Sequence, residues 1–325
     1  MRQVRLEPIK FFDIAHLPKV KYSIFMPVFS GIRNVSVPAP AKVNLFLSVS
    51  GRRKDGFHEL LTVIAKLNLY DLVTLEVHDQ PGGTSILCPG HSELENSENL
   101  AVRAVNIWRS VTGSDQRISI TINKKIPVQA GLGGGSSDAV ATLLGLNAMM
   151  QEKLSFQGLL EIATQVGSDC ASFLMPGLCV ASGRGEKVRE VDIASRAALV
   201  GKKVLVFKPG LGFSTAQIFG NLKSSDYGFT SLAFAEQEIE KWEKGETTLS
   251  QFMRNDLEAP VLRKFVFVEA MIQELKERFQ LDVLLCGSGS CCLSLIPDEL
   301  DINPVRNLIE ELWGSGIFMS ETHFI

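Results

Sequence analysis

A glycine-rich run over residues 126–138, IPVQAGLGGGSSD, constrains the fold of this chain more than any other feature. Before it, residues 117–122 alternate between polar and apolar, the pattern of a half-buried strand; after it, apolar residues from Ala139 onward follow helical spacing. Glycines let backbone N–H groups turn toward one point, and the first turn of a helix aims its free N–H groups at the same place. The run therefore predicts a strand, a polyphosphate-binding loop and a helix, with N-cap chemistry from Ser136–Asp138.

The run does not match the two commonest phosphate loops. A Walker loop ends in Gly-Lys-Ser/Thr, whereas Gly135 is followed here by two serines. A dinucleotide-binding loop needs Gly-x-Gly-x-x-Gly within a rhythm of parallel strands, which this chain lacks. A flexible glycine hinge is the structural alternative, although so dense a run directly before a helix favours phosphate binding.

Composition narrows the class of protein. The 325 residues suffice for about two domains. A formal net charge of −3 offers no basic excess, which argues against a general nucleic-acid binder. The six cysteines form no Cys-x-x-Cys pair and the five histidines no cluster, so we expect buried free thiols in a reducing cytoplasm and no metal held by side chains. No apolar stretch is long enough to span a membrane.

The first 35 residues differ from the rest. They carry six basic residues against Glu7 and Asp13, but they contain no clear apolar core of a targeting signal. Translation from Met26 would also make most of this leader an artefact. We therefore expect residues 1–35 to be a disordered or artefactual extension rather than an import signal.

The remaining chain mixes strand and helix patterns without a regular strand–helix alternation, which predicts an α+β fold. We expect a first domain over residues 36–198 and a second over residues 199–325. The expected strands cover residues 37–49, 60–69, 72–77, 117–122, 202–208 and 291–296, with a turn near Tyr70-Asp71 between the second and the third. The expected helices cover residues 99–111, 154–166, 232–244 and 266–279, besides the one that follows the glycine run.

Four short motifs follow one another along the chain, and their order is informative. They are PAKVNL at 40–45, DGFH at 55–58, GLGGGSS at 131–137 and GSD at 167–169. Together they resemble the GHMP family of small-molecule kinases, from about Val37 nearly to the C-terminus. The resemblance implies a two-domain GHMP-kinase-like fold. Its N-terminal ATP-binding domain would hold a left-handed βαβ-type phosphate loop, and its C-terminal domain would be an α/β sandwich.

The resemblance also implies an activity. GHMP kinases transfer a phosphoryl group from ATP, with Mg²⁺, to an alcohol. The first two motifs are similar to those of members that phosphorylate a cytidylyl sugar-alcohol in the non-mevalonate route to isoprenoid precursors. The expected partners are therefore ATP and this small molecule, without nucleic acid or membrane, for a cytoplasmic monomer or weak homodimer.

Two residues are expected to carry the chemistry. Lys42 stands in an otherwise apolar strand, where an ammonium needs a carboxylate or phosphate partner. Asp169 resembles the catalytic aspartate of the family, a general base for the acceptor hydroxyl, and is the natural partner of Lys42. Without the resemblance, Asp169 could be the N-cap of residues 170–174, and Lys42 an edge-strand lysine that reaches water.

The resemblance implies ATP contacts from the glycine-rich loop, where Ser136 or Ser137 would reach a phosphate or Mg²⁺, and from two residues near the adenosine. The expected ATP-binding residues are Pro127, Val128, Gln129, Ala130, Gly131, Leu132, Gly133, Gly134, Gly135, Ser136, Ser137, Asn99 and Lys124.

For the acceptor, Asn44 shares a strand face with Lys42 and is expected to bind the substrate near the reacting hydroxyl. The resemblance makes Phe57 a stacking face for the cytosine and His58 a reader of its edge. The family more often has tyrosine at the first of these positions. Thr215 and Phe219 resemble residues that close the substrate site from the second domain.

Two further features accompany the resemblance. Residues 287–290 resemble the third motif of the family, a glycine turn that is expected to support the site. Val128-Gln129-Ala130 replaces a more glycine-rich approach to the phosphate loop, and Cys286, Cys291 and Cys292 flank the third motif without a catalytic meaning.

Two other functions remain open. One is a sister GHMP kinase that acts on homoserine, mevalonate or a sugar and needs no cytidine pocket. The other is a catalytically silent nucleotide-binding regulator, against which the presence of both Lys42 and Asp169 argues.

Overall fold

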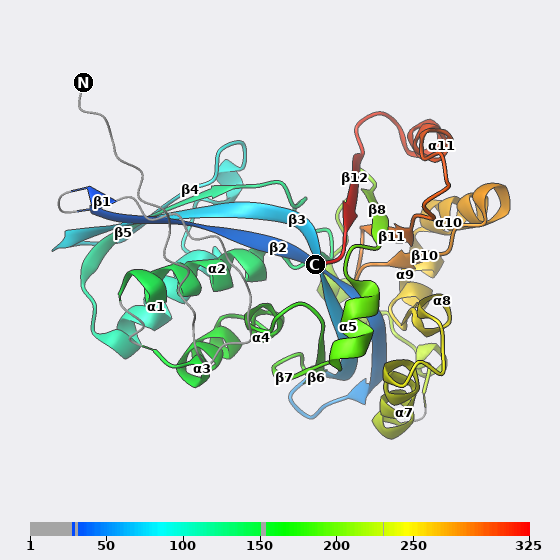
Figure 1. Ribbon diagram of the computed structural model, residues 1–325, viewed down its shortest axis with the longest axis horizontal. Helices are drawn as coiled ribbons and strands as arrows, with labels where there is room; N and C mark the ends of the chain where they lie inside the picture. The colour runs from blue at the N-terminus through cyan, green and yellow to red at the C-terminus, as the bar shows by residue number, and fades with distance from the viewer. Residues whose placement is uncertain (1–27, 30–31, 151–153, 230) are drawn as a thin grey trace. The chain divides into compact units, whose positions relative to one another are not determined.

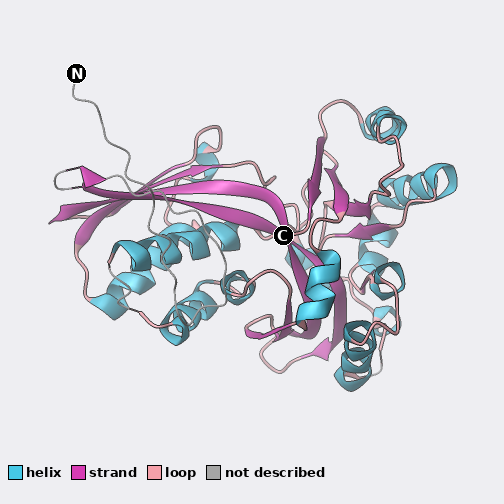
Figure 2. Ribbon diagram, in the orientation of Figure 1, coloured by secondary structure: helices cyan, strands magenta, loops and turns pink. Residues whose placement is uncertain are grey.

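A computed structural model describes residues 28–29, 32–150, 154–229 and 231–325 (Figure 1). Helices and strands are mixed along the chain, as expected (Figure 2). The described residues form two compact units, the first from residues up to Ala39, Asp71–Lys124 and Gly135–Cys170, and the second from Pro40–Tyr70, Lys125–Gly134 and Ala171–Ile325. These units differ from the domains expected from the sequence, because the long strands β2 (Ile32–Arg52) and β3 (His58–Pro81) each contribute to both.

The first unit is a sheet with helices along one face. Strand β5 (Gln116–Asn123) pairs antiparallel with β3, with Leu72 opposite Asn123, and parallel with β4 (Thr84–Leu87); β1 (Val28–Phe29) pairs antiparallel with β2. The expected alternation is present, since Ile118, Ile120 and Ile122 are buried. Helices α1 (Leu100–Thr112), α2 (Gly134–Met149) and α3 (Phe156–Val166) lie on the same side of this sheet (Figure 1).

Helix α2, which follows the glycine run, packs unusually close to the sheet. A Cβ atom at Gly145 would lie 2.7 Å from Leu75 Cδ1 and 3.1 Å from Val35 Cγ1, so only glycine fits there. The helix begins at Gly134, because the two glycines before Ser136 are already helical. The prediction of N-cap chemistry from Ser136–Asp138 was therefore wrong: Ser136 and Ser137 lie in the first turn of the helix, and Asp138 follows that turn.

Strand β3 is one strand and not two. The turn expected at Tyr70-Asp71 is absent, because the inward alternation continues through Leu69, Asp71 and Val73, all of which are buried. The Asp71 carboxylate is compensated by Lys124, whose Nζ lies 2.5 Å from its Oδ2. A buried partner thus turns a residue that is typical of turns into a strand residue.

Strand β2 begins five residues before the expected start at residue 37. The predicted extension 1–35 lies mostly outside the described residues, but residues 28–29 and 32–35 belong to β1 and β2. Val35 is fully buried and continues the alternation of Val37 and Ala39, which is why the strand extends. For these residues the prediction of an unstructured extension was wrong.

The second unit contains the other half of β3, which pairs antiparallel with β6 (Cys179–Gly183); β6 pairs in turn with β7 (Lys187–Glu190). The two-residue strand β9 (Arg254–Asn255) runs parallel to β2 beside Phe46 and Leu47. A separate four-stranded sheet is antiparallel throughout. Its order is β10 (Val283–Leu285), β11 (Cys292–Leu295), β8 (Lys203–Lys208) and β12 (Phe318–His323).

Helices cover this second sheet on both faces. Leu205 and Phe207 of β8 enter a core with α9 (Glu258–Lys264), α10 (Val266–Phe279) and α11 (Asn303–Trp313). Val204 and Val206 point the other way, into a core with α7 (Leu232–Glu243). The shorter helices are α4 (Cys170–Leu174), α5 (Ile193–Leu199), α6 (Thr215–Gly220) and α8 (Leu249–Phe252). Among the described helices, none combines the length and the apolar character that crossing a membrane requires.

Candidate active site

A chain of buried hydrogen bonds begins at Lys42 of β2. Its Nζ donates to Asn44 Oδ1 at 2.8 Å, Asn44 Nδ2 donates to Thr62 Oγ1 at 2.8 Å, and Thr62 Oγ1 donates to the carbonyl of Phe46 at 2.7 Å. Lys42, Asn44 and Thr62 are each at most 4% exposed. The period-2 geometry of the strand brings Lys42 and Asn44 onto one face, as predicted. Thr62, from the neighbouring β3, fixes which way the Asn44 amide points.

The glycine-rich loop lies against this chain. The Lys42 amide donates to the carbonyl of Leu132 at 2.9 Å. A Cβ atom at Gly133 would lie 2.9 Å from Lys42 Cγ and 2.9 Å from Phe173 Cζ. Position 133 must therefore be glycine if the loop is to pack on the stem of the lysine.

Residues 128–130, just before the glycines of the loop, are the segment in which the sequence departs from the glycine-rich pattern of the family. Gln129 adopts a left-handed backbone with φ 53°, a conformation that costs about 1–2 kcal/mol for a residue other than glycine. Its side chain packs over Gly212, where a Cβ atom would lie 2.6 Å from Gln129 Oε1. The loop thus reaches a glycine-like conformation here without a glycine.

A pocket of about 420 Å³ opens beside this part of the loop. Its lining combines the glycine-rich loop, the start of α6 and the third glycine turn, and consists of Gln129, Gly131, Gly212, Phe213, Ser214, Thr215 and Gly289. Thr215, expected at the substrate, bonds Ser288 through its hydroxyl at 2.8 Å. Two motifs that lie far apart in the sequence therefore meet at one pocket of the second unit.

The two serines in the first turn of α2 differ in their surroundings. Ser136 is hydrogen-bonded to the thiol of Cys170. Ser137 is 1% exposed, and its hydroxyl has no hydrogen-bond partner among the described residues. A buried hydroxyl without a partner is costly, which distinguishes Ser137 from Ser136 as the one whose hydroxyl would gain from a bound anion.

Asp169 lies between α3 and α4, directly before Cys170, and is half-buried. It belongs to the first unit, whereas Lys42 belongs to the second. Its pairing with Lys42 and its role as a base stay predictions.

Lys124 and Asn99, both expected near the adenosine, have their side chains engaged within the first unit. Lys124 Nζ contacts Asp71 at 2.5 Å and Asp138 at 2.7 Å, and all three side chains are buried. Asn99 is the N-cap of α1: its Oδ1 accepts from the Ala101 amide at 2.9 Å. Their contact with a nucleotide stays a prediction, and the structural roles of both side chains are clear.

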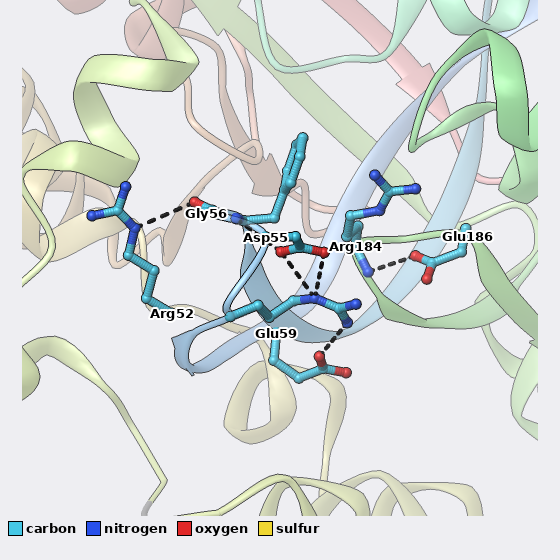
Figure 3. A network of polar contacts seen from close by, with 8 residues as sticks. Arg52, Asp55, Gly56, Glu59, Arg184 and Glu186 are labelled. Carbon is cyan, nitrogen blue, oxygen red and sulfur yellow. Dashed lines mark hydrogen bonds and ion pairs between the residues drawn. The ribbon is translucent and has the colours of Figure 1, made fainter.

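The Asp55-Gly56-Phe57 segment forms the tight turn between β2 and β3, shown in Figure 3. Asp55 Oδ1 accepts from the Phe57 amide at 3.1 Å, Gly56 has a φ of 85°, and Arg53 bridges the carboxylates of Asp55 and Glu59. The Asp-Gly pair of the motif therefore shapes the turn.

This turn presents the ring of Phe57, which is 50% exposed. The Arg184 guanidinium lies 5.0 Å from the centroid of that ring, a cation–π distance. Arg184 comes from the turn between β6 and β7, where its amide donates to the Glu186 carboxylate at 2.6 Å (Figure 3). Phe57 thus pairs with a guanidinium.

His58 packs instead against Phe219 of α6, with ring centroids 5.1 Å apart and an interplanar angle of 32°. Burial, together with the nearby positive charge of Arg52, lowers the pKa of His58 below its ordinary value of 6.5. The imidazole is therefore neutral at pH 7, and one of its nitrogens can accept a hydrogen bond. The structure brings together the two residues that were expected from separate segments.

Two residues of the candidate site, Thr62 and Arg184, were not predicted from the sequence. Thr62 was one polar residue within an apolar strand segment, and its spacing relative to Lys42 and Asn44 carries no signal without the strand pairing. Arg184 lies in the turn between β6 and β7, and nothing in the sequence relates that turn to Phe57.

Comparison with known proteins shows which proteins this chain is similar to. A family model described as "GHMP kinases N terminal domain" matches residues 99–177. A relative from Syntrophomonas wolfei is 35% identical over 270 residues, covering 82% of this chain and 91% of its own length. One from Desulfitobacterium hafniense is 36% identical over 277 residues, covering 82% and 89%. Both are named 4-diphosphocytidyl-2-C-methyl-D-erythritol kinase.

Solved structures agree with this fold. A crystal structure of 4-(cytidine 5'-diphospho)-2C-methyl-D-erythritol kinase matches with a TM-score of 0.67 and 31% identity, covering 89% of this chain and 99% of that one. A homoserine kinase from Cytophaga hutchinsonii matches with a TM-score of 0.66 but only 17% identity, covering 89% and 94%, so this second likeness concerns the fold alone.

Proposed function

The chain belongs to the 4-diphosphocytidyl-2-C-methyl-D-erythritol kinase family, and we propose that it phosphorylates the 2-hydroxyl of 4-diphosphocytidyl-2-C-methyl-D-erythritol with ATP. The acceptor oxygen forms a bond to the γ-phosphorus, and the bond from that phosphorus to the β,γ-bridging oxygen breaks. A base takes the hydroxyl proton, and the products are the 2-phosphate and ADP. The reaction is a step of non-mevalonate isoprenoid precursor synthesis.

The buried Lys42–Asn44–Thr62 chain is the observation that carries this proposal. The Lys42 ammonium is 4% exposed and donates to Asn44 Oδ1 at 2.8 Å, so its direction is set by the buried hydrogen bonds of the protein. Phosphoryl transfer spreads negative charge over the transferred oxygens, and a cation that is already oriented stabilises this charge without reorganisation. Lys42 is assigned this role, and Asn44 and Thr62 keep its ammonium oriented.

Asp169 is assigned as the general base. The acceptor hydroxyl loses its proton as the new P–O bond forms, and a carboxylate within hydrogen-bond reach can accept that proton. Asn44 is assigned to the substrate side of the site, where its position beside Lys42 would bring it near the reacting hydroxyl.

ATP is assigned to residues 127–137. The backbone N–H groups of the loop and of the first turn of α2 suit a triphosphate, because the helix begins in glycines that leave those N–H groups uncovered. The unpartnered hydroxyl of Ser137 suits a phosphate oxygen. The Mg²⁺ ion would be bound chiefly by the phosphate oxygens of ATP, and it would neutralise charge on the β- and γ-phosphates.

The cytidylyl group is assigned to the Phe57–His58 turn with Phe219 of α6. Phe57 offers an exposed aromatic face, and the neutral His58 can accept a hydrogen bond from an exocyclic amino group. Thr215, one turn before Phe219, is assigned to the same substrate. The six buried free thiols suit the reducing conditions of a cytoplasm, where we place the enzyme.

A coupled assay of ADP release tests the proposal. Purified protein is given ATP and Mg²⁺ with 4-diphosphocytidyl-2-C-methyl-D-erythritol, with the same sugar alcohol lacking the cytidylyl group, with homoserine or with mevalonate. The expected result is turnover of the cytidylyl substrate with a kcat/KM at least about 100-fold above that of the others, a difference worth about 3 kcal/mol. Equal turnover without the cytidylyl group, or preference for homoserine or mevalonate, would overturn the substrate assignment.

A further inference from the structure

Asn255 of β9 uses its whole amide group to hold one backbone turn. It is 5% exposed, and its Nδ2 donates to the carbonyls of Leu285 at 2.8 Å and Gly287 at 2.7 Å. Its Oδ1 accepts from the Leu257 amide at 2.9 Å. Both N–H donors and the carbonyl oxygen are therefore engaged, and the amide can point in one direction only.

The turn that Asn255 holds, residues 286–291, contains the third glycine motif. Two backbone bonds close it, from the Cys286 amide to the Cys291 carbonyl and from the Gly289 amide to the Cys286 carbonyl, both at 2.8 Å. Gly287 and Gly289 have φ values of 56° and 78°, which favour glycine. The turn has no regular secondary structure of its own, so its position depends on such contacts.

Gly287 of this turn also lies beside Lys42 and Asn44. A Cβ atom at Gly287 would lie 3.3 Å from Asn44 Oδ1 and 3.6 Å from Lys42 Nζ. The backbone of Gly287 therefore limits the space in which the Lys42 ammonium and the Asn44 amide can lie.

The same turn also contacts the phosphate loop and α6. The Cys291 amide donates to the carbonyl of Ala130 at 3.1 Å, and a Cβ atom at Gly131 would lie 1.9 Å from the Cys286 carbonyl oxygen. Ser288 bonds Thr215 at 2.8 Å. A displacement of the turn would thus reach the phosphate loop, the lysine and the substrate helix together.

The segment that carries Asn255 is itself anchored. Asp256 Oδ2 accepts from the Val49 amide at the end of β2, at 2.9 Å, and Glu258 Oε1 accepts from the Leu285 amide at 2.8 Å. The Asp256 amide donates to the carbonyl of Leu47 at 2.9 Å. The residue that follows Asn255 is therefore hydrogen-bonded to β2, the strand that carries Lys42. Through this connection Asn255 can couple the position of β2 to the position of the turn.

We propose that Asn255 is a positioning residue for phosphoryl transfer, which sets the backbone of Gly287 against Lys42 and Asn44 without touching the substrate. This proposal rests on the proposed kinase function. It needs asparagine at position 255: aspartate would place carboxylate oxygens against two carbonyls, and alanine would leave both carbonyls without their buried donor.

The test compares Asn255→Asp with a matched control, Asn147→Asp. Asn147 of α2 is 7% exposed; its Nδ2 donates to the Leu154 carbonyl at 3.0 Å and its Oδ1 accepts from the Leu154 amide at 2.9 Å. Each variant loses buried hydrogen bonds between a side-chain amide and the backbone, so each should lower the Tm of the protein. Only Asn255→Asp should lower kcat, by about 10- to 100-fold because small misplacements at a site are that costly, and this loss should exceed any rise in the KM for ATP.

A double variant sharpens the result. Gly287→Ala disturbs the same contact from the other side, so Asn255→Asp with Gly287→Ala should lower kcat little further than the worse single variant. Should Asn255→Asp fail to fold, Asn255→Ser keeps one hydroxyl donor and should give a smaller loss of kcat. An unchanged kcat in a folded Asn255 variant, equal losses in Asn255→Asp and Asn147→Asp, or additive losses in the double variant would overturn the proposal.

A readout that does not depend on activity separates this proposal from the proposed function. Amide hydrogen exchange over residues 285–291 should speed up in the Asn255 variant and stay unchanged in Asn147→Asp. If the wild-type protein shows no turnover while exchange responds in this way, the function is wrong and Asn255 still positions the turn. If exchange over the turn does not respond, the positioning role is wrong whatever the activity.

Discussion

The Lys42 ammonium donates to Asn44 Oδ1 at 2.8 Å, so that one side chain on a buried strand face orients another two positions away. The relation assigns Asn44 a second task besides the predicted contact with substrate. It also makes Thr62 part of the site, because Thr62 accepts from the other end of the Asn44 amide.

Thr62→Val tests this chain with little change of shape. Valine removes the acceptor of Asn44 Nδ2, so the Asn44 amide loses its fixed orientation and Lys42 with it. We expect kcat to fall about 10-fold and the free energy of unfolding to drop by about 1–3 kcal/mol, the cost of an unsatisfied buried donor. Steady-state kinetics and urea unfolding measure the two effects.

Thr74→Val is the matched control, since Thr74 Oγ1 bonds Ser36 Oγ at 2.9 Å within the sheet of the first unit. It should lower stability without lowering kcat. A Thr62 variant with the kcat of wild type would show that Asn44 needs no such support.

Asp169→Asn tests the general base, because asparagine keeps the shape of the side chain and cannot accept the proton. We expect kcat to fall by about 10²- to 10⁴-fold, the usual contribution of general base catalysis, while the affinity for ATP stays within about twofold. Steady-state kinetics and titration with a fluorescent ATP analogue give the two numbers. Near-wild-type turnover would assign proton removal to another group.

Phe57→Ala tests the cytidine site. Stacking of a base on an aromatic ring is worth about 1–3 kcal/mol, so the KM for the cytidylyl substrate should rise about 10-fold or more, and the KM for ATP should change little. Phe234→Ala on α7 is the control, because Phe234 is 53% exposed and lies outside the assigned site. Equal increases in both KM values would contradict the stacking role of Phe57.

The sequence predicts those parts of the site that depend on residues close together in the chain, and it misses those that depend on residues far apart in the chain. The position of the glycine-rich run between a strand and a helix could be predicted, because the alternation before it and the helical spacing after it are local patterns; its binding of phosphate stays a prediction. Lys42 and Asn44 were expected on one face, because the strand period is local as well. Asp71 was misjudged as a turn residue because its partner Lys124 is 53 positions away in the chain. Asn255 and Arg184 likewise contact segments that are distant in the chain and that only the tertiary fold brings near.

The dependence of KM on pH in the acidic range tests the role of His58. Burial and the charge of Arg52 hold its pKa below 6.5, so the imidazole is neutral from pH 7 upward and becomes a cation only as the pH falls below 6.5. A cation cannot accept a hydrogen bond from an amino group. The KM for the cytidylyl substrate should therefore be constant above pH 7 and rise only as the pH falls below the ordinary histidine value of 6.5, and the KM for ATP should not follow. His58→Gln should remove this rise; a rise that persists in the variant would assign it to another group.

The Asp71–Lys124–Asp138 cluster predicts an unusual dependence of stability on pH. Burial raises the pKa of Asp138 to about 7, and the neighbouring Asp71 adds to this, although Lys124 opposes it. The folded state then keeps a proton that the unfolded state releases near the ordinary aspartate pKa of 3.8. By linkage, this contribution to stability is present at low pH and is lost as the pH rises through about 7.

Asp138→Asn tests this dependence, since its amide stays neutral at every pH. Between pH 5.5 and pH 8, the free energy of unfolding of wild type should fall relative to that of the variant by at least ~1.4 kcal/mol, the equivalent of one pKa unit. Urea unfolding at both pH values measures the difference. Asp282→Asn is the control: hydrogen bonds from Lys276 and Ser250 hold the pKa of Asp282 below its usual value, so that carboxyl is ionised across the whole range. Parallel profiles for wild type and Asp138→Asn would mean that Asp138 is already ionised at pH 5.5 and that Lys124 outweighs burial.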